Sequence, residues 1–234
     1  MSCFGVIALK SYLFIQEKIY IQITKYEYSD LLEKNEVLER DPWGVKVLET
    51  PDKKILKIFR LKRLFSSAYF YPYALRFKHN AAFLEKKGVK TVDVENIVYC
   101  MGVQRHVLSY KKVMGQPVSS AIEKSQDSKA LLKKLISFVT SLHSKGIYFR
   151  SLHLGNIIME PDGTFVLIDI SDMRFFPHKL TINQRIRNWK HVLKNEFERE
   201  IIADYGWDDF INEYASCSML TLRDKEKLRL KLKR

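Results

Sequence analysis

Residues 149–170 read FRSLHLGNIIMEPDGTFVLIDI, and this stretch decides the fold. After a loop come two short apolar runs, Ile157-Ile158-Met159 and Phe165–Ile168, on either side of a Pro-Asp-Gly sequence. Proline followed by aspartate and glycine is typical of a tight turn, so the two runs are expected to pair as a β-hairpin. Asn156 stands at the entry of this hairpin and Asp169 at its exit. The sequence therefore predicts an amide and a carboxylate at the open end of one hairpin.

One helix is expected directly before residues 149–170, and another is expected after them. Apolar residues recur at helical spacing and the series ends at the sequence His-Ser-Lys-Gly; they are Leu131, Leu132, Leu135, Ile136, Val139 and Leu142. Residues 182–204 also have a helical pattern, and the tail from Arg223 to Arg234 is strongly basic. The second half of the chain is therefore expected to be mainly helical.

The first half is expected to be mainly β-structure. Three strands form an antiparallel meander and two further strands follow a helix; the strands are Val37–Arg40, Val45–Glu49, Ile55–Phe59, Val94–Cys100 and Val107–Val113. The helix covers residues 73–86, with Leu75, Ala82 and Phe83 near one face and Gly88 as its C-cap. A break at Met114-Gly115-Gln116-Pro117 separates the two halves.

The order of helix, loop, asparagine, hairpin and aspartate resembles the catalytic core of kinase-like enzymes. The usual kinase loop is H-R-D-L-x-x-x-N, and the aminoglycoside and lipopolysaccharide-core kinases carry a variant that ends in L-H-x-G-N. This chain reads Phe149-Arg150-Ser151-Leu152-His153-Leu154-Gly155-Asn156. Asn156 follows Ser151 by five residues, the spacing of asparagine and aspartate in that motif. Asp169 lies 13 residues beyond Asn156 (169 − 156), at the position of the D-F-G aspartate.

The resemblance implies ATP and Mg²⁺ as cofactors. Asn156 and Asp169 would bind the metal, because hard oxygen ligands are what a phosphate-bound magnesium requires. The alternative interpretation of each residue alone is a turn asparagine and a strand-end cap. The resemblance further places Lys57, inside the apolar strand ILKIF, on the nucleotide phosphates, although a solvent-facing lysine remains the alternative. We expect the three groups to converge on one cleft between two lobes.

Other nucleotide-binding positions follow from the same resemblance. Met114 and Gly115 correspond to the hinge that would bind adenine through its backbone. Asn80 stands where a kinase helix has the acidic partner of the lysine, with Glu85 as a later candidate. The glycine-rich phosphate loop is nearly absent, since Gly44 alone occupies the turn after Pro42-Trp43.

The catalytic base is the largest departure from the kinase pattern. Ser151 replaces the aspartate that accepts the proton of the acceptor hydroxyl, and a serine hydroxyl is a very poor base at neutral pH. Asp172 and His153 are the titratable groups close enough in sequence to substitute for it. Phosphoryl transfer depends chiefly on positioning and charge neutralisation, so this change puts turnover in doubt and leaves nucleotide binding intact.

The wider resemblance, over residues 37–194, is to the lipopolysaccharide kinase superfamily and its toluene-tolerance subgroup. It lies in the segments RFKHNAAFLEKKGV, FRSLHLGNI and RNWKHVLK. That subgroup tends to carry serine in this loop, so the resemblance makes Ser151 a feature of the lineage. It implies an α+β, two-lobed protein-kinase-like fold, with an N-terminal extension over 1–30, an N-lobe over 31–113 and a reduced C-lobe over 114–234. It also implies phosphorylation of a Kdo or heptose sugar of the lipopolysaccharide inner core.

The alternative from the residues is a pseudokinase, a nucleotide-binding or scaffold protein that uses this fold without turnover. Ser151 and the eroded phosphate loop favour it. Neither interpretation reveals the oligomeric state.

The formal net charge of +13 favours an anionic partner. Arg185, Arg187, Lys190 and His191 form a helical cluster that would suit an anionic sugar, although a solvated helix face is the alternative. The basic tail leaves contact with an anionic membrane surface open. No aromatic-basic interleaving or nucleic-acid motif is present, so no nucleic acid is expected.

The apolar N-terminus is interrupted by Lys10, Glu17 and Lys18, whereas a spanning helix needs roughly 20 apolar residues. The three cysteines are far apart and lack metal-site spacing, which fits a reducing compartment. We therefore expect a cytoplasmic protein, with peripheral contact at the inner membrane left open.

Overall fold

The computed structural model describes residues 20–60 and 71–233. The chain divides into two compact units. One contains the described residues up to Ala81 together with Val92–Lys112, and the other contains Ala82–Thr91 together with the residues from Val113 onward. Within the described part of the chain, no helix has the length and apolar character needed to cross a membrane. The expectation for the apolar N-terminus before residue 20 lies outside the described residues.

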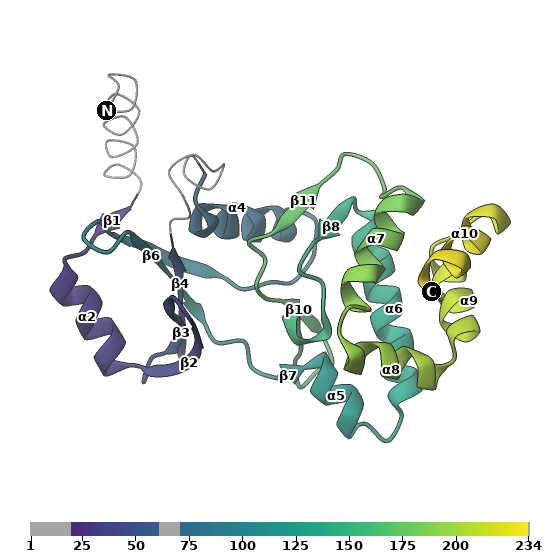
Figure 1. The fold of residues 1–234 in the computed structure, drawn as a ribbon, viewed down its shortest axis with the longest axis horizontal. Helices are drawn as coiled ribbons and strands as arrows, with labels where there is room; N and C mark the ends of the chain where they lie inside the picture. The colour runs from purple at the N-terminus through teal and green to yellow at the C-terminus, as the bar shows by residue number, and fades with distance from the viewer. Residues whose placement is uncertain (1–19, 61–70, 234) are drawn as a thin grey trace. The chain divides into compact units, whose positions relative to one another are not determined.

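The first unit is built on a six-stranded sheet (Figure 1). The strand order is β1-β5-β6-β4-β3-β2, and the strands are β1 Ile21–Gln22, β2 Glu36–Asp41, β3 Gly44–Glu49, β4 Lys54–Arg60, β5 Val94–Cys100 and β6 Arg105–Lys111. The expected antiparallel meander is confirmed, since β2 pairs with β3 and β3 pairs with β4. Strand β4 then pairs with β6 over its whole length. Lys57 therefore lies in an interior strand.

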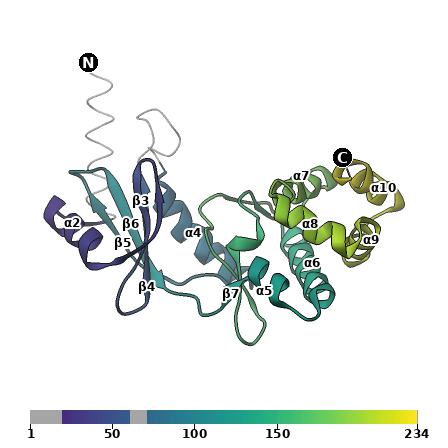
Figure 2. The same ribbon diagram turned by 60° about the horizontal axis from the view of Figure 1, so that its bottom comes forward.

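A helix covers each face of this sheet: α2 (Lys25–Lys34) lies on one side of the strands and α4 (Tyr73–Lys86) on the other (Figures 1 and 2). The face toward α2 is an aliphatic cluster of Leu48, Leu56, Ile58 and Val107, against which side chains of α2 pack. The opposite face is aromatic. The Phe77 ring of α4 lies 6.1 Å from the Phe59 ring and 5.8 Å from the Tyr110 ring, centroid to centroid. Alternation along β4 places Lys57 on this second face.

Helix α4 forms where the sequence predicts it, but the expected apolar face is wrong. Phe83 is exposed, as is Ala82, and Leu75 is half-buried. The buried positions are Ala74, Phe77, Ala81 and Leu84. These four recur at intervals of three and four residues, which is the spacing of one helical stripe. The buried face was assigned wrongly because it was placed on the larger apolar residues, whereas alanines occupy half of the buried stripe.

Residues 20–34 belong to the first unit rather than to a separate extension. Ile21 and Gln22 pair with Val98 and Tyr99 as a parallel edge strand. Helix α2 follows, with a capping box in which Thr24 and Glu27 exchange hydrogen bonds. It crosses residue 30, so the expected limit between extension and N-lobe falls inside a helix.

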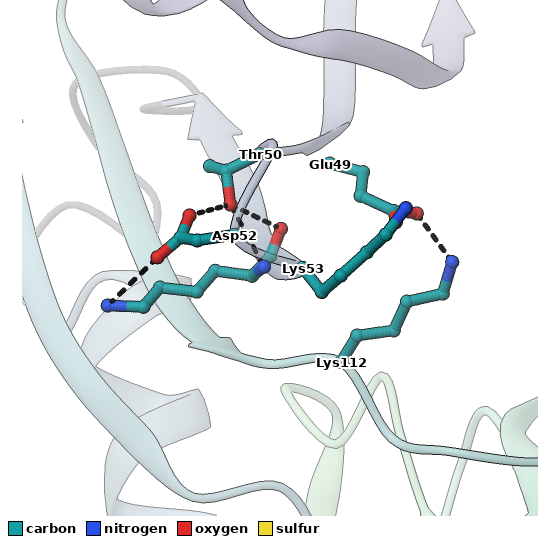
Figure 3. Close-up of polar contacts among 6 residues, drawn as sticks. Glu49, Thr50, Asp52, Lys53 and Lys112 are labelled. Atoms are coloured by element: carbon teal, nitrogen blue, oxygen red, sulfur yellow. Dashed lines mark hydrogen bonds and ion pairs between the residues drawn. The ribbon is translucent and has the colours of Figure 1, made fainter.

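The turn between β3 and β4 carries a polar cluster (Figure 3). Its centre is Glu49, whose carboxylate is 4% exposed and pairs with Lys53 at 2.9 Å and Lys112 at 2.5 Å. The hydrogen bonds from these two ammonium groups lower the pKa of Glu49. Across the turn, the Thr50 hydroxyl donates to Asp52 and accepts from the backbone N–H of Lys54. The cluster holds the end of β6 against the meander, because Lys112 directly follows that strand.

The second unit contains two small sheets and a group of helices (Figure 2). The sheet orders are β10-β9-β7 and β11-β8; the elements are β7 Gln116–Pro117, α5 Val118–Lys124, α6 Ser128–Ser144, β8 Ile147–Phe149, η1 Leu154–Asn156, β9 Ile157–Met159, β10 Phe165–Leu167, β11 Met173–Phe175, α7 Ile182–Val192, α8 Glu196–Tyr205, α9 Trp207–Cys217 and α10 Leu222–Leu232. The expected hairpin is β9–β10. The helix expected over 182–204 is two helices, since the Asn195 side chain caps α8 by accepting from Phe197 N–H.

The basic tail is folded. Within α10, Leu228 and Leu232 are buried. Arg229 and Lys233 each pair with Asp208 of α9, at 3.1 Å and 2.8 Å. Part of the positive charge of the tail is therefore neutralised inside the second unit.

A buried polar network anchors β8, the strand that leads into the residues 149–156. The Asn188 amide of α7 donates to the Phe149 carbonyl at 2.6 Å, and its oxygen lies 3.1 Å from His143 Nε2. His143 Nδ1 lies 2.6 Å from the Tyr214 hydroxyl. Burial lowers the pKa of His143 to about 3, so the ring is neutral. Its Nε2–H then donates to Asn188 and its Nδ1 accepts from Tyr214.

Replacing Asn188 by leucine should destabilise the second unit. The change leaves the His143 Nε2–H buried without a partner, which costs about 1–3 kcal/mol. The Phe149 carbonyl keeps the Leu152 N–H at 3.2 Å but loses its shorter hydrogen bond. Asn183→Leu, at an exposed position on the same helix, should change the free energy of unfolding by no more than about 0.5 kcal/mol. Urea denaturation monitored by tryptophan fluorescence measures both variants. Equal effects of the two substitutions would contradict the anchoring role of Asn188.

Candidate functional site

The β9–β10 hairpin brings Asn156 and Asp169 to the same end. Leu167 pairs with Ile157, the first residue of β9, so the two strands are in register at the open end. One step further, the backbone N–H of Ile168 donates to the backbone carbonyl of Asn156 at 3.0 Å. Asp169 is the next residue. The juxtaposition predicted from the sequence is thus built into the backbone of the hairpin.

The Asn156 side chain is buried and oriented by one hydrogen bond. Its amide nitrogen donates to the backbone carbonyl of Ser151 at 2.9 Å. Its backbone N–H donates to the His153 carbonyl at 3.0 Å, which closes the short helical turn η1. Because the amide nitrogen is committed to the loop, the amide oxygen is the atom that can bind a cation.

Asp169 has a backbone conformation that few residues adopt. Its φ is +51°, in the left-handed region. A non-glycine residue at positive φ is uncommon, and such residues cluster at functional sites, where the surrounding structure holds them in place. Here the hairpin bond at Ile168 fixes the chain just before the aspartate. The backbone is therefore specified at the point where the carboxylate leaves the hairpin.

The two donors fit a magnesium ion that is shared with a phosphate. An amide oxygen and a carboxylate are hard ligands, and Mg²⁺ is usually held by one or two protein groups plus water and substrate phosphates. Within residues 20–60 and 71–233, no group of three or more histidine, cysteine, aspartate or glutamate side chains is placed to hold a metal by itself. Asn156 and Asp169 would therefore need phosphate oxygens or water to complete the coordination of a magnesium ion.

Ser151 lies beside the asparagine, and the two proposed substitutes for a base belong to the same part of the fold. Asp172 accepts the backbone N–H of Arg150 through its carbonyl at 3.1 Å, and its carboxylate pairs with the Arg150 guanidinium at 3.3 Å. His153 is exposed, and desolvation lowers its pKa while the nearby Asp169 carboxylate opposes that shift. His153 is therefore mainly neutral at neutral pH, the form that accepts a proton. All of these residues belong to the second unit.

Met114 and Gly115 lie against the hairpin. Gln116 pairs with Met159 of β9, and the Met114 side chain is 70% exposed. Gly115 has a φ of +142°, and a Cβ at this position would lie 2.2 Å from the Met159 carbonyl oxygen. Only glycine fits here. This close approach explains Gly115 without reference to adenine, so the nucleotide hinge stays a prediction.

Lys57 and Asn80 belong to the first unit. The Lys57 ammonium lies 5.9 Å from the Phe77 ring centroid and 6.0 Å from that of Phe59. Phe77 and Asn80 are three residues apart on α4, so they lie on neighbouring turns of one helix face. Glu85 is exposed and groups with the second unit. The convergence of Lys57 with Asn156 and Asp169 stays a prediction.

Glu198 of α8 makes a contact with the loop that the sequence does not predict. Its carboxylate is 2% exposed and accepts the backbone N–H of Leu154, the first residue of η1. Its second oxygen, Oε2, has no hydrogen-bond partner among the described residues. Burial raises the pKa of Glu198 to about 7, although the hydrogen bond from Leu154 opposes the shift. No local pattern signals this contact, because the two residues are 44 positions apart.

The expected basic cluster on α7 needs one correction. Arg185 is 3% exposed and points inward, where its Nε donates to the Leu180 carbonyl at 2.8 Å. Arg187 and Lys190 are exposed and His191 is half-buried. The expectation of a surface position for Arg185 follows from the usual exposure of arginine. Its spacing to buried Trp189, four residues later, places it on the buried face instead.

Glu198→Gln should remove a pH dependence of stability. The pKa of Glu198 is higher in the folded protein, about 7, than its ordinary value of 4.5. The folded state then binds more protons between these values, so stability is lost as the pH rises from 4.5 through 7. The stability of Glu198→Gln relative to wild type should rise over this range and level off above it. Urea unfolding from pH 5 to 8 measures it, with exposed Glu196→Gln as control; parallel wild-type and Glu198→Gln profiles would contradict the assignment.

Comparison with known proteins identifies the fold but no family. No family model matches the chain, and no curated protein is similar in sequence. A crystal structure of monomeric WbdD superposes with a TM-score of 0.50 at 16% identity, over 79% of this chain and 44% of that chain. A second structure of WbdD, described as a bifunctional kinase-methyltransferase, superposes with a TM-score of 0.45 at 14% identity. The match covers 80% of this chain and 47% of that chain. The PK-1 kinase of Cydia pomonella granulovirus superposes with a TM-score of 0.40 at 13% identity, over 87% of this chain and 89% of that chain.

These identities are too low to carry function, and the superposition on monomeric WbdD carries the conclusion on fold. The chain spans less than half of the length of WbdD. Its first unit is a sheet with helices, and its second unit is mainly helical. The chain therefore has an α+β protein-kinase-like fold.

Proposed function

We propose that the protein is an ATP- and Mg²⁺-dependent phosphotransferase whose acceptor is a hydroxyl of a lipopolysaccharide inner-core sugar. The observation that carries this proposal is the hydrogen bond between Ile168 N–H and the Asn156 carbonyl. It holds an amide oxygen and a carboxylate, Asn156 and Asp169, at the open end of one hairpin. In the transfer, the acceptor oxygen forms a bond to the γ-phosphorus, the bond from that phosphorus to ADP breaks, and the hydroxyl proton passes to a base.

The residues of the chain have distinct roles in this proposal. Asn156 and Asp169 hold the metal, which neutralises the charge of the phosphates. Lys57 binds the nucleotide phosphates, and Met114 with Gly115 binds the base. His153 is favoured as the proton acceptor, because its lowered pKa keeps it neutral and because the Asp172 carboxylate is paired with Arg150. Ser151 contributes its carbonyl, which orients Asn156.

The sugar acceptor is supported by two observations of different kinds. The segments RFKHNAAFLEKKGV, FRSLHLGNI and RNWKHVLK resemble lipopolysaccharide-core kinases, whose acceptors are Kdo or heptose. The second unit, in addition, carries exposed arginines beside Ser151, which suit an anionic acceptor. Such an acceptor would be met at the cytoplasmic face of the inner membrane.

A pseudokinase is the second candidate function, favoured by Ser151 itself. A loop without the aspartate retains the groups that would bind the nucleotide and lacks the usual proton acceptor. The protein would then bind Mg·ATP without turnover and act as a scaffold. The two candidates share the nucleotide site and differ in the transfer step alone.

Asp169→Ala should abolish magnesium-dependent binding of ATP. Loss of a second-shell partner commonly costs 10- to 100-fold in metal affinity, so loss of a ligand should cost about 100-fold or more. The control is Asp162→Ala, in the turn of the same hairpin, which removes an exposed carboxylate that accepts the Thr164 N–H. This variant should leave the affinity for Mg·ATP unchanged. Isothermal titration with and without Mg²⁺ measures both. Unchanged affinity in Asp169→Ala would remove the metal-site assignment.

Ser151→Asp separates the two candidate functions. A general base contributes about 10²- to 10⁴-fold to rate, so a gain of this size would identify a disabled enzyme. Loss of an existing activity would show instead that the serine loop transfers phosphate by its own route. Ser151→Asn is the matched control, since it has a similar size and no basic carboxylate. The assay measures transfer of labelled phosphate from ATP to extracted lipopolysaccharide core.

A further inference from the structure

The β8–β11 sheet presents charged side chains on one face. The two strands are antiparallel, with Tyr148 opposite Arg174. Alternation along the strands places Arg150 on the same face as Tyr148, and Asp172 on the same face as Arg174. Both arginines are exposed. The opposite face carries apolar side chains such as Phe149, which is fully buried.

Helix α7 and the residues after it add to the same face. Arg187 and His191 are four residues apart, one above the other on the helix, and Lys194 follows by three residues. Burial raises the pKa of the Tyr148 phenol, and the charges of Arg187, Arg150 and Arg174 oppose that shift, so these three side chains lie near the phenol. The charges of Lys194, Arg187 and Arg150 act on His191 in turn. We call this set of residues, with Tyr148 at its centre, the Tyr148 basic cluster.

The cluster has more positive charge than its own residues neutralise. Arg150, Arg174, Arg187 and Lys194 each carry one positive charge, whereas Asp172 is the single acidic group among those that act on Tyr148 or His191. The Asp172 carboxylate is already paired with Arg150 at 3.3 Å. Like charges held this close are unfavourable without a counter-ion, and several guanidinium groups together are the usual way in which proteins bind phosphate or carboxylate.

Tyr148 supplies an independent indication of a ligand. The side chain is 5% exposed, and its hydroxyl has no hydrogen-bond partner among the described residues. A buried donor without an acceptor costs about 1–3 kcal/mol, and buried hydroxyls are nearly always paired. An anion held between the arginines would give this hydroxyl an acceptor. The missing acceptor and the excess positive charge occur at the same place.

We propose that the Tyr148 basic cluster is an anion subsite that binds the phosphate monoester of the acceptor beside Ser151. The proposal rests on the proposed function, because it assigns the acceptor class. A phosphate monoester fits better than a carboxylate, because it carries up to two negative charges and three acceptor oxygens against four cations and one phenol. Arg150 adjoins Ser151 in the chain, so an acceptor anchored here has its remaining hydroxyl groups near the loop that contains Asn156.

The test is direct binding of glucose 6-phosphate in the absence of nucleotide, with glucose as the neutral match. We expect saturable binding of the sugar phosphate and none of glucose. Arg187→Gln and Arg174→Gln should each weaken binding about tenfold or more, because a hydrogen bond to a charged group is lost. Arg223→Gln, an exposed arginine of α10 with the same change of charge, should have no effect. Thermal unfolding checks that each variant is folded.

Two further measurements locate the bound anion at the cluster. Tyr148→Phe should weaken binding while leaving the fold intact, since only the unpartnered hydroxyl is removed. The His191 ring resonances should shift on binding, and its pKa, which desolvation and the nearby cations lower, should rise when an anion arrives. Both changes require the ligand at this cluster rather than elsewhere on a basic protein.

Three outcomes would overturn the proposal: binding of glucose as well as its phosphate, equal affinity in Arg187→Gln and Arg223→Gln, or binding only to phosphatidic acid vesicles. The last would assign the cluster to a lipid headgroup. Failure here, with Asp169-dependent binding of Mg·ATP intact, removes the subsite and leaves the proposed function. Binding of the sugar phosphate without any binding of Mg·ATP has the opposite meaning, since it supports the subsite and removes the phosphotransferase.

Discussion

The hydrogen bond from Ile168 N–H to the Asn156 carbonyl is the constraint on which the candidate site depends. It extends the register of β9 and β10 to the point where the strands part. Asn156 and Asp169 are thereby brought to one place without any contact between their side chains being required. The strained φ of Asp169, +51°, immediately follows this bond, so the hairpin supplies the rigidity that such a conformation needs.

Helical elements of the second unit hold the loop before the hairpin from two sides. Asn188 binds the carbonyl of Phe149 at the start of the loop, and Glu198 binds the N–H of Leu154 in its middle. Both supporting side chains are almost fully buried. A loop that is fixed at both places loses little further freedom when a ligand binds, which is the general advantage of a preorganised site. Helices α7 and α8 thus support the candidate site although neither contains Asn156 or Asp169.

Much of this could be predicted from the sequence, because the signals are local. The hairpin follows from a Pro-Asp-Gly turn between two apolar runs, and its open end places Asn156 and Asp169 near each other in the backbone. The contacts of Glu198 and Asn188 could not be predicted, since each joins residues about 40 positions apart and a single sequence carries no information on such pairs. The inward position of Arg185 escapes prediction for a related reason: only the packing of the helix reveals which of its arginines is buried. Nothing in the sequence distinguishes Tyr148, and only the fold shows that its hydroxyl is buried without a partner among the described residues.

The parallel edge strand β1 affects which backbone groups of the six-stranded sheet are available for hydrogen bonding at its edge. Ile21 and Gln22 pair with Val98 and Tyr99 and so cover this part of the outer edge of β5. An uncovered strand edge is a template on which a second chain adds its own strand. A version of the protein shortened to start at α2 would lose this cover, together with the buried Tyr20, whose ring centroid lies 4.7 Å from that of His106. Self-association of such a shortened chain would then follow from the uncovered edge of β5 at Val98 and Tyr99.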